Sequence, residues 1–235
     1  MPKPSTSNKT NLYNKMRNLP IIGIVVILIV AGAGIFIYFN LTKQAEVPKV
    51  EIMTKTLEGK KIAMVIAFRD FRDIEYFIPK DVLQEAGARI TTISSKRGTA
   101  VGADGGEAEV DLVISEVNAA NFNAVIFIGG PGMGQNLDNE EFQKLAKDTV
   151  KADRVLGAIC IAPALLAKAG ILKDKKATVW SSPMDKSAIK ILKDSGAEYL
   201  EEDVVTDGKI VTAAGPFAAE EFARKIIEAL TKNNK

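Results

Sequence analysis

The sequence predicts an α/β domain with a mostly parallel sheet, preceded by one transmembrane helix. Between residues 60 and 233, short apolar runs that are almost continuous alternate with amphipathic stretches. Such runs are typical of parallel strands covered by helices on both faces, which gives a three-layer sandwich. The second observation is the uncharged segment 20–39, which as a helix is long enough to cross the hydrocarbon core of a bilayer.

The N-terminal part divides into three predicted segments. Residues 1–19 form a polar, disordered tail, residues 20–39 the membrane anchor, and residues 40–59 a linker. A cleaved signal peptide is the alternative for the apolar segment, because small residues stand at 31–33, but the apolar run continues beyond them. Basic residues before the span favour a cytoplasmic N-terminus. We therefore expect a single-pass membrane protein with its globular domain outside the cytoplasm.

Strands and helices of the domain are predicted from the apolar periodicity. Strands are expected at residues 62–68, 88–94, 124–128, 155–159, 177–179, 204–205 and 210–212. Helices are expected at residues 140–150 and 185–193 and from about residue 218 onward, and an earlier helix is expected to include residues 79–86 and to be closed by Gly87. Because ligands bind at the carboxyl ends of such strands, the loops 69–75 and 129–134 and the turn at Cys160 are the places to look for a site.

The composition limits the chemistry that the chain can perform. The formal net charge is only +2 and the chain has no histidine, so it lacks both the charge of a nucleic-acid-binding protein and the commonest general base. With no histidine and one cysteine, no zinc site or disulfide is expected, and no spacing indicates a calcium loop. We expect no metal, no cofactor and no nucleic-acid partner.

The one cysteine, Cys160, is the strongest candidate for chemistry. It lies between the predicted strand 155–159 and a helix-like stretch at residues 164–167. A sharp turn from strand to helix would hold the thiol beside the helix N-terminus, where free N–H groups and the helix dipole stabilise a thiolate. The alternative is a buried cysteine that only fills the core.

Two further segments are candidates to complete the site. Glu75, at the start of the first helix, either complements the helix dipole or points at the sulfur as a protonated carboxyl. Gly129 and Gly130 follow the third strand, and their backbone N–H groups, with Ile161, could form an oxyanion or anion pocket. The glycines do not fit the dinucleotide-binding fingerprint, and no P-loop lysine follows them.

For four other side chains, a structural role is the alternative to a role in the site. Trp180 either packs at a strand end or lines the pocket together with Ser182. Arg69 and Arg72 are expected to be solvated or paired with neighbouring aspartates, although a basic mouth would suit an anionic substrate.

Together these segments resemble the ThiJ/PfpI superfamily, a cysteine-containing group with the flavodoxin-like, class I glutamine amidotransferase-like fold. The resemblance covers residues 60–233 and is carried, in order, by Glu75-Tyr76-Phe77-Ile78-Pro79 and by residues 97–102, 127–132, 158–163 and 207–212. Residues 213–216, followed by Glu221-Phe222-Ala223, are especially similar to the Parkinson-disease deglycase branch.

The resemblance implies roles for the site residues. Cys160 matches the nucleophile or redox cysteine of the family, Glu75 the carboxyl that contacts its sulfur, and Gly129 and Gly130 the pocket of backbone amides. It implies a glyoxalase or deglycase that acts on small carbonyl compounds or glycated substrates. It also implies a homodimer or larger homo-oligomer.

The chain departs from the family at two positions. The protease-like branch has histidine directly after the cysteine, where this chain has Ile161. The deglycase branch commonly has histidine at the position of Ser182. No Cys-His dyad can therefore form within this chain, so peptidase activity is not expected. A non-enzymatic redox sensor or interaction protein is the alternative to a carbonyl-processing enzyme.

Overall fold

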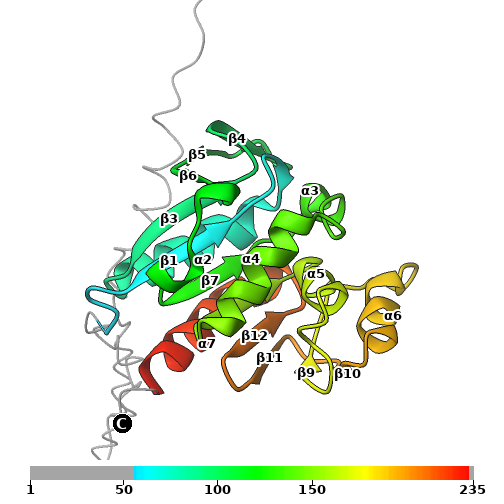
Figure 1. Ribbon diagram of the computed structural model, residues 1–235. Helices are drawn as coiled ribbons and strands as arrows, with labels where there is room; N and C mark the ends of the chain where they lie inside the picture. Colours follow the sequence, from blue (N-terminus) through cyan, green and yellow to red (C-terminus); the bar gives the residue numbers. More distant parts are fainter. Residues whose placement is uncertain (1–55, 233–235) are drawn as a thin grey trace, which may run out of the picture. The chain divides into compact units, whose positions relative to one another are not determined.

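The computed structural model describes residues 56–232 and has an α/β fold with one central sheet between layers of helices (Figure 1). The predicted tail and membrane anchor at 1–19 and 20–39, and the linker at 40–59 up to residue 55, lie outside the described residues. The last residues of that predicted linker belong to the domain instead, because Leu57 is buried in its core and its N–H donates to the carbonyl of Ala86 at 2.9 Å. Within residues 56–232, no helix combines the length and apolar character needed to cross a membrane.

The central sheet has seven strands in the order β11-β12-β8-β7-β1-β3-β6. These strands are β1 (Lys61–Val65), β3 (Arg89–Ser94), β6 (Leu112–Val113), β7 (Ala124–Phe127), β8 (Val155–Ile159), β11 (Val204–Asp207) and β12 (Ile210–Ala213). Neighbouring strands run parallel except at the β11–β12 edge, where the pair is antiparallel. The predicted mostly parallel sheet is confirmed.

The register brings the carboxyl ends of three strands together. Val65 of β1 pairs with Phe127 of β7, which in turn pairs with Ala158 of β8. The loops that follow these strands therefore leave the sheet side by side, as expected for a parallel sheet whose ligands bind at this edge.

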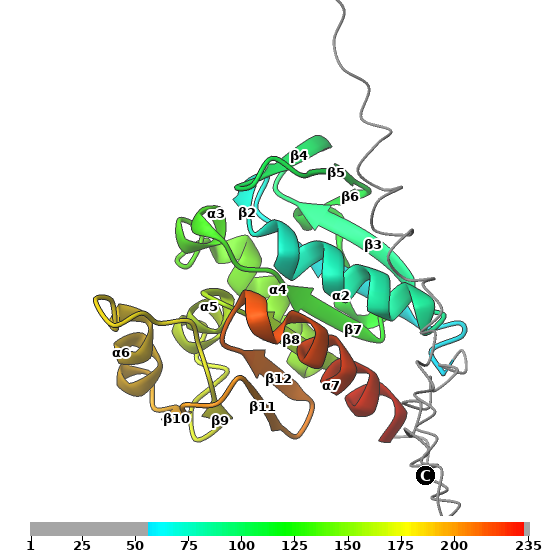
Figure 2. The same ribbon diagram turned by 180° about the vertical axis from the view of Figure 1, so that it is seen from behind.

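Two pairs of helices cover the sheet. The helices α2 (Asp73–Glu85) and α7 (Ala219–Thr231) pack together on one face (Figure 2), and α4 (Glu140–Lys151) and α5 (Ala162–Lys168) cover the other (Figure 1). The remaining short helices are η2 (Ile114–Glu116), η3 (Ala119–Asn121), α3 (Pro131–Gly134), α6 (Ser187–Asp194) and η4 (Pro216–Ala218). Separate buried apolar clusters fill the two spaces between sheet and helices.

Helix α4 shows how the sequence specifies a covering helix. Its buried residues Phe142, Leu145, Ala146 and Thr149 recur at helical spacing, so one face packs on the sheet while the other stays in water. The side chain of Asn139 caps its first turn by accepting a hydrogen bond from the backbone N–H of Glu141 at 3.0 Å.

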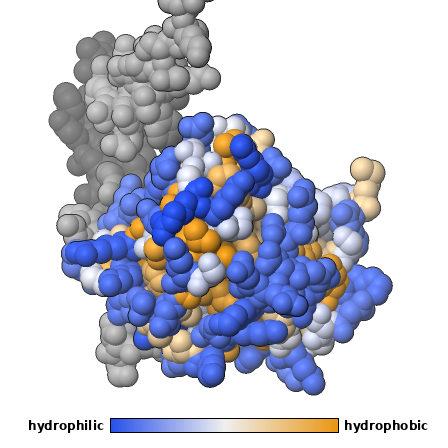
Figure 3. Space-filling view, turned by 45° about the horizontal axis from the view of Figure 1, so that its top comes forward, coloured by the Kyte–Doolittle hydropathy of each residue, from blue (hydrophilic) through white to orange (hydrophobic). Residues whose placement is uncertain are grey.

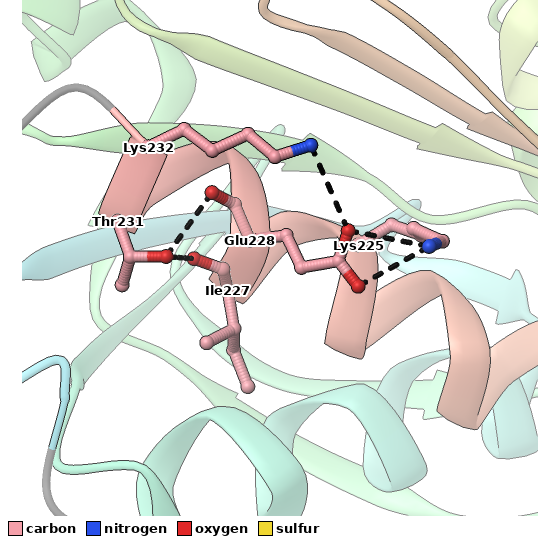
Figure 4. A network of polar contacts seen from close by, with 5 residues as sticks. All are labelled: Lys225, Ile227, Glu228, Thr231 and Lys232. Carbon is pink, nitrogen blue, oxygen red and sulfur yellow. Dashed lines mark hydrogen bonds and ion pairs between the residues drawn. The ribbon is translucent and has the colours of Figure 1, made fainter.

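The end of α7 is closed by local polar contacts (Figure 4). The hydroxyl of Thr231 donates to the backbone carbonyl of Ile227 at 2.9 Å, and the carboxylate of Glu228 pairs with Lys225 at 3.2 Å and with Lys232 at 4.0 Å. Such exposed ion pairs contribute about 0–1 kcal/mol each. Burial of apolar residues such as Phe222 holds this helix in place.

Two smaller sheets flank the central one. The first has the order β2-β4-β5, from β2 (Arg69–Phe71), β4 (Gly98–Gly102) and β5 (Glu107–Val110). The second pairs β9 (Lys176–Ala177) with β10 (Glu198–Tyr199), so the predicted strand at 177–179 lies outside the central sheet. The predicted first strand, 62–68, ends at Val65, because the chain turns away from the sheet there to form β2.

Apolar residues also reach the surface. Figure 3 shows apolar side chains in the middle of one face, surrounded by hydrophilic ones. Among residues 56–232, the large hydrophobic residues that are exposed are Ile74, Ile78, Val150, Met184 and Phe217.

Candidate functional site

Cys160 lies in a strained turn directly after β8. Its φ of 64° is in the left-handed region, which costs a non-glycine residue about 1–3 kcal/mol. The turn is held on both sides, because the N–H of Cys160 donates to the carbonyl of Ala213 in β12 at 2.8 Å and its carbonyl accepts from Trp180 at 2.9 Å. Helix α5 begins two residues later, so the cysteine stands at a strand-to-helix elbow, as the sequence predicted.

Glu75 lies in the first turn of α2, and its side chain is completely buried. Neither carboxyl oxygen has a hydrogen-bond partner of ordinary geometry within residues 56–232. A buried carboxyl without such a partner is rare, because desolvation penalises its charged form strongly. A role in complementing the helix dipole therefore does not by itself explain why the carboxyl of Glu75 is buried.

Gly129 brings the carboxyl and the cysteine together. A Cβ placed on Gly129 would lie 2.7 Å from Oε2 of Glu75, 2.5 Å from Cβ of Cys160 and 2.8 Å from the carbonyl oxygen of Ile159. Only glycine fits between them. The N–H of Arg72, just before α2, also donates to the carbonyl of Gly129 at 3.1 Å, which fastens the start of the helix to this edge of the sheet.

The environment of Glu75 raises its pKa from 4.5 to about 7. Burial is the main cause, and the negative charge of Asp104 adds to it. The Cys160 side chain, the Arg72 guanidinium and the backbone of Gly129 lower this pKa, but by less. Near neutral pH the carboxyl is therefore poised to take up or release a proton.

The pKa of the Cys160 thiol is raised, whereas the sequence predicted that it would be lowered. Burial raises its pKa from 9.0 to about 12, and the negative charge of Glu75 adds to the increase. The backbone N–H groups of Gly130 and Ile161 favour the thiolate but do not outweigh these effects. Burial therefore outweighs the expected stabilisation of a thiolate at the helix N-terminus, because Cys160 is only 8 % exposed.

A pocket of about 250 Å³ opens at this edge of the sheet. It is lined by Arg72, Glu75, Gly130, Pro131, Gly134, Cys160, Ile161, Trp180 and Pro216. Gly129 is not among the lining residues, since it lies between Glu75 and Cys160. The hole of backbone amides beside the sulfur is therefore formed by Gly130 and Ile161.

The structure separates the two residues that were predicted to form the pocket wall. Trp180 lines the pocket, whereas Ser182 does not and instead accepts a hydrogen bond from the N–H of Asp185 at 3.0 Å. Arg72 also lines the pocket, although the sequence predicted only Glu75, three residues later, as a site residue. Pro216 was not predicted to be a site residue. The sequence signal that could have identified it is its position after β12, whose carboxyl end lies at the same edge of the sheet as that of β8.

Within residues 56–232, no three or more carboxylate or cysteine side chains are grouped in a way that could hold a metal ion.

The sequence matches known proteins over the whole described domain. The sequence model of the DJ-1/PfpI family matches residues 60–229. The uncharacterized protein MJ0967 of Methanocaldococcus jannaschii is 38% identical over 182 residues, which is 77% of this chain and 87% of that protein. Protein/nucleic acid deglycase 2 of Escherichia coli is 32% identical over 175 residues, 73% of this chain and 98% of that protein.

A glyoxalase and a solved structure are also similar. The glutathione-independent glyoxalase DJR-1.2 of Caenorhabditis elegans is 29% identical over 171 residues, 73% of this chain and 89% of that protein. The crystal structure of a ThiJ/PfpI domain protein from Brachyspira murdochii superposes with a TM-score of 0.70 at 32% identity, covering 74% of this chain and 99% of that one.

Proposed function

The chain belongs to the DJ-1/PfpI family, and we propose that it converts small reactive carbonyl compounds at Cys160, as a glyoxalase or a deglycase. The observation that carries this proposal is the position of the one cysteine beside the buried carboxyl of Glu75, at the base of a pocket. Relatives named as a deglycase and a glyoxalase support the same chemistry.

The first step is addition of the sulfur to the carbonyl carbon. The thiol is weakly acidic here, so it needs a base, and the Glu75 carboxylate accepts its proton as the C–S bond forms. The carbonyl oxygen becomes an oxyanion, which the N–H groups of Gly130 and Ile161 stabilise. Glu75 then returns the proton to this oxygen, which gives a hemithioacetal.

The second step moves hydrogen between two carbons of a 2-oxoaldehyde. Glu75 removes the proton from the former aldehyde carbon, and the electron pair passes to the adjacent carbonyl, which gives an enediolate. Protonation of the second carbon leaves a thioester of a 2-hydroxy acid, and water hydrolyses it to the free acid and the thiol. The aldehyde carbon is oxidised and its neighbour reduced, so no external oxidant is required.

A glycated amine enters the same sequence one step later. The sulfur of Cys160 displaces the amine from the carbinolamine carbon, the C–N bond breaks, and protonated Glu75 supplies the proton that leaves with the amine. The hemithioacetal that results is the one described above. A single proton carrier therefore serves both reactions, which suits a chain that has no histidine.

The alternatives fit less well. Peptidase chemistry needs a basic side chain beside the nucleophile. This chain has no histidine, and the residue that follows Cys160 is the apolar Ile161. A redox sensor needs an accessible thiolate, whereas burial raises the pKa of the Cys160 thiol.

Turnover of methylglyoxal by the full chain tests the proposal. We expect the wild type to form lactate, and Cys160→Ala and Glu75→Gln to lose at least about 100-fold in kcat/KM, as is typical when a general acid–base group is removed. Wild-type rates no higher than those of the two variants would overturn it.

The setting of the domain is a further part of the proposal. The uncharged segment 20–39 supports membrane anchoring, with the catalytic domain outside the cytoplasm. Resistance of the chain to carbonate extraction, and digestion of its domain by protease added to intact cells, are the expected results. The exposed apolar side chains on the described domain support self-association. Light scattering of the purified chain tests for a homodimer or larger assembly.

A further inference from the structure

The pocket beside Cys160 carries a positive charge that the proposed reaction does not use. Among the described residues that line it, the ionisable groups are Arg72, Glu75 and the cysteine itself. The others are glycine, proline, isoleucine and tryptophan. A guanidinium in a mostly apolar wall is the group that would orient a charged ligand, because such pockets use few polar groups for specificity.

The backbone of Arg72 is fixed at the mouth of the pocket. Its N–H donates to the carbonyl of Gly129 at 3.1 Å, and its own carbonyl accepts from the N–H of Tyr76 at 3.2 Å in the first turn of α2. A Cβ on Gly130 would lie 2.5 Å from the Arg72 nitrogen, so the two segments are in close contact. The side chain therefore leaves a rigid position directly beside the amide hole.

The guanidinium of Arg72 is only partly engaged by protein groups. Its Nη1 atom pairs with Asp104 at 3.2 and 3.3 Å, and that aspartate side chain is 53% exposed. An exposed pair of this kind is weak and exchanges readily with solvent or ligand. Arginine has five N–H donors in a planar fork, so donors remain for a bidentate bond to a carboxylate.

We infer that Arg72 is a specificity-determining residue, which gives this pocket a preference for small carbonyl electrophiles that carry a carboxylate over neutral ones of the same size. The inference rests on the proposed function, since it takes Cys160 as the atom that meets the electrophile. The volume of about 250 Å³ suits a compound of a few carbon atoms. Asp104 acts against the preference, because its carboxylate competes for the same guanidinium.

Alkylation of Cys160 tests the inference without any turnover. The full chain is treated with iodoacetate or iodoacetamide at one pH, and mass spectrometry follows the one cysteine. The quantity compared is the ratio of the two rate constants, since changes in thiol reactivity alter both rates equally. We expect Arg72→Gln to lower the iodoacetate-to-iodoacetamide ratio about three- to five-fold, the size of a partly exposed charge interaction.

Three variants sharpen the comparison. Arg72→Lys keeps the charge and should retain most of the preference, whereas Asp104→Asn should raise the ratio above that of the wild type. Arg89→Gln removes an exposed cation at the opposite end of β3 and should leave the ratio unchanged.

An unchanged ratio in Arg72→Gln, or an equal fall in Arg89→Gln, would overturn the inference. Failure of methylglyoxal turnover would instead overturn the proposed function, because the alkylation ratio does not depend on it.

Discussion

Gly129 is the residue that allows a carboxyl and a thiol to meet at the carboxyl ends of β7 and β8. We expect Gly129→Ala to destabilise the fold by about 1–3 kcal/mol, as is typical of overpacking, and to abolish turnover. One of the atoms that the new methyl group would meet is a backbone carbonyl, that of Ile159, which cannot move aside cheaply. Urea unfolding and methylglyoxal assays measure the two effects.

The matched control for this substitution is Gly134→Ala in α3. A Cβ there would meet nothing within 4 Å, so stability should change by only a few tenths of a kcal/mol. The comparison concerns stability alone, since Gly134 lines the pocket. An equal loss of stability in the two variants would mean that the crowding at Gly129 is not its cause.

The charge of Glu75 also sets the acidity of the cysteine. Because this charge raises the pKa of the thiol, we expect Glu75→Gln to lower it from about 12. The rate of alkylation by iodoacetamide as a function of pH measures the change, with Cys160→Ala as the blank. A higher thiol pKa in the variant would contradict this expectation, since it would mean that Glu75 mainly stabilises the thiolate by donating a hydrogen bond.

At the scale of the elements, the start of α2 fastens the small sheet β2-β4-β5 to the pocket. Asp73, the first residue of the helix, is buried, and its carboxylate accepts the N–H groups of Asp104 at 2.8 Å and Gly106 at 2.5 Å. A Cβ on Gly102 would also lie against this carboxylate, so the loop between β4 and β5 is shaped around it. One side chain thus positions Asp104, the ion-pair partner of Arg72.

Asp73→Asn should therefore destabilise the chain by about 1–3 kcal/mol, because one amide oxygen replaces two charged acceptors for the loop. It should also raise the iodoacetate preference of Cys160, since the loop would no longer hold Asp104 against the Arg72 guanidinium. Urea unfolding and alkylation rates measure these effects. Asp81→Asn, an exposed change in the same helix, should alter neither quantity, and a similar loss in both variants would refute the role of the loop.

The elements differed in how well the sequence predicted them. Strands such as β7 and β8 are apolar throughout, and their positions could be predicted because burial on both faces leaves a continuous run. The strands β4 and β5 were missed. They are only five and four residues long and half exposed, and β4 begins and ends with glycine, so neither forms the continuous apolar run by which the buried strands were identified.

For the molecule as a whole, the mostly parallel sheet could be predicted from the sequence, but the order of its strands and the electrostatics of the candidate site could not. Cys160, Glu75 and the glycine turn could be assigned because parallel strands bring their carboxyl ends together. The depth of burial depends on how α2, α7 and the sheet pack, and that burial reverses the expected acidity of the thiol. Residue type and spacing alone did not contain this information.

Burial of Glu75 also makes the stability of the whole fold depend on pH. Its carboxyl ionises near 4.5 in the unfolded chain and near 7 in the folded protein. Between these values the folded state holds a proton that the unfolded state has lost, so the contribution of this group to stability declines as pH rises through the window. Above pH 7 the loss amounts to about 3 kcal/mol, at 1.4 kcal/mol per pKa unit.

Glu75→Gln removes this loss. We expect the variant to match the wild type in free energy of unfolding at pH 4.5 and to be more stable by up to about 3 kcal/mol at pH 8, even though it is inactive. Urea unfolding of both proteins at the two pH values measures the difference, and Glu85→Gln, an exposed change in the same helix, should show none. A difference between wild type and Glu75→Gln that is the same at both pH values would mean that the carboxyl does not change its ionisation on folding. The backbone conformation of Cys160 would then be the one remaining feature of the site that lowers the stability of the fold.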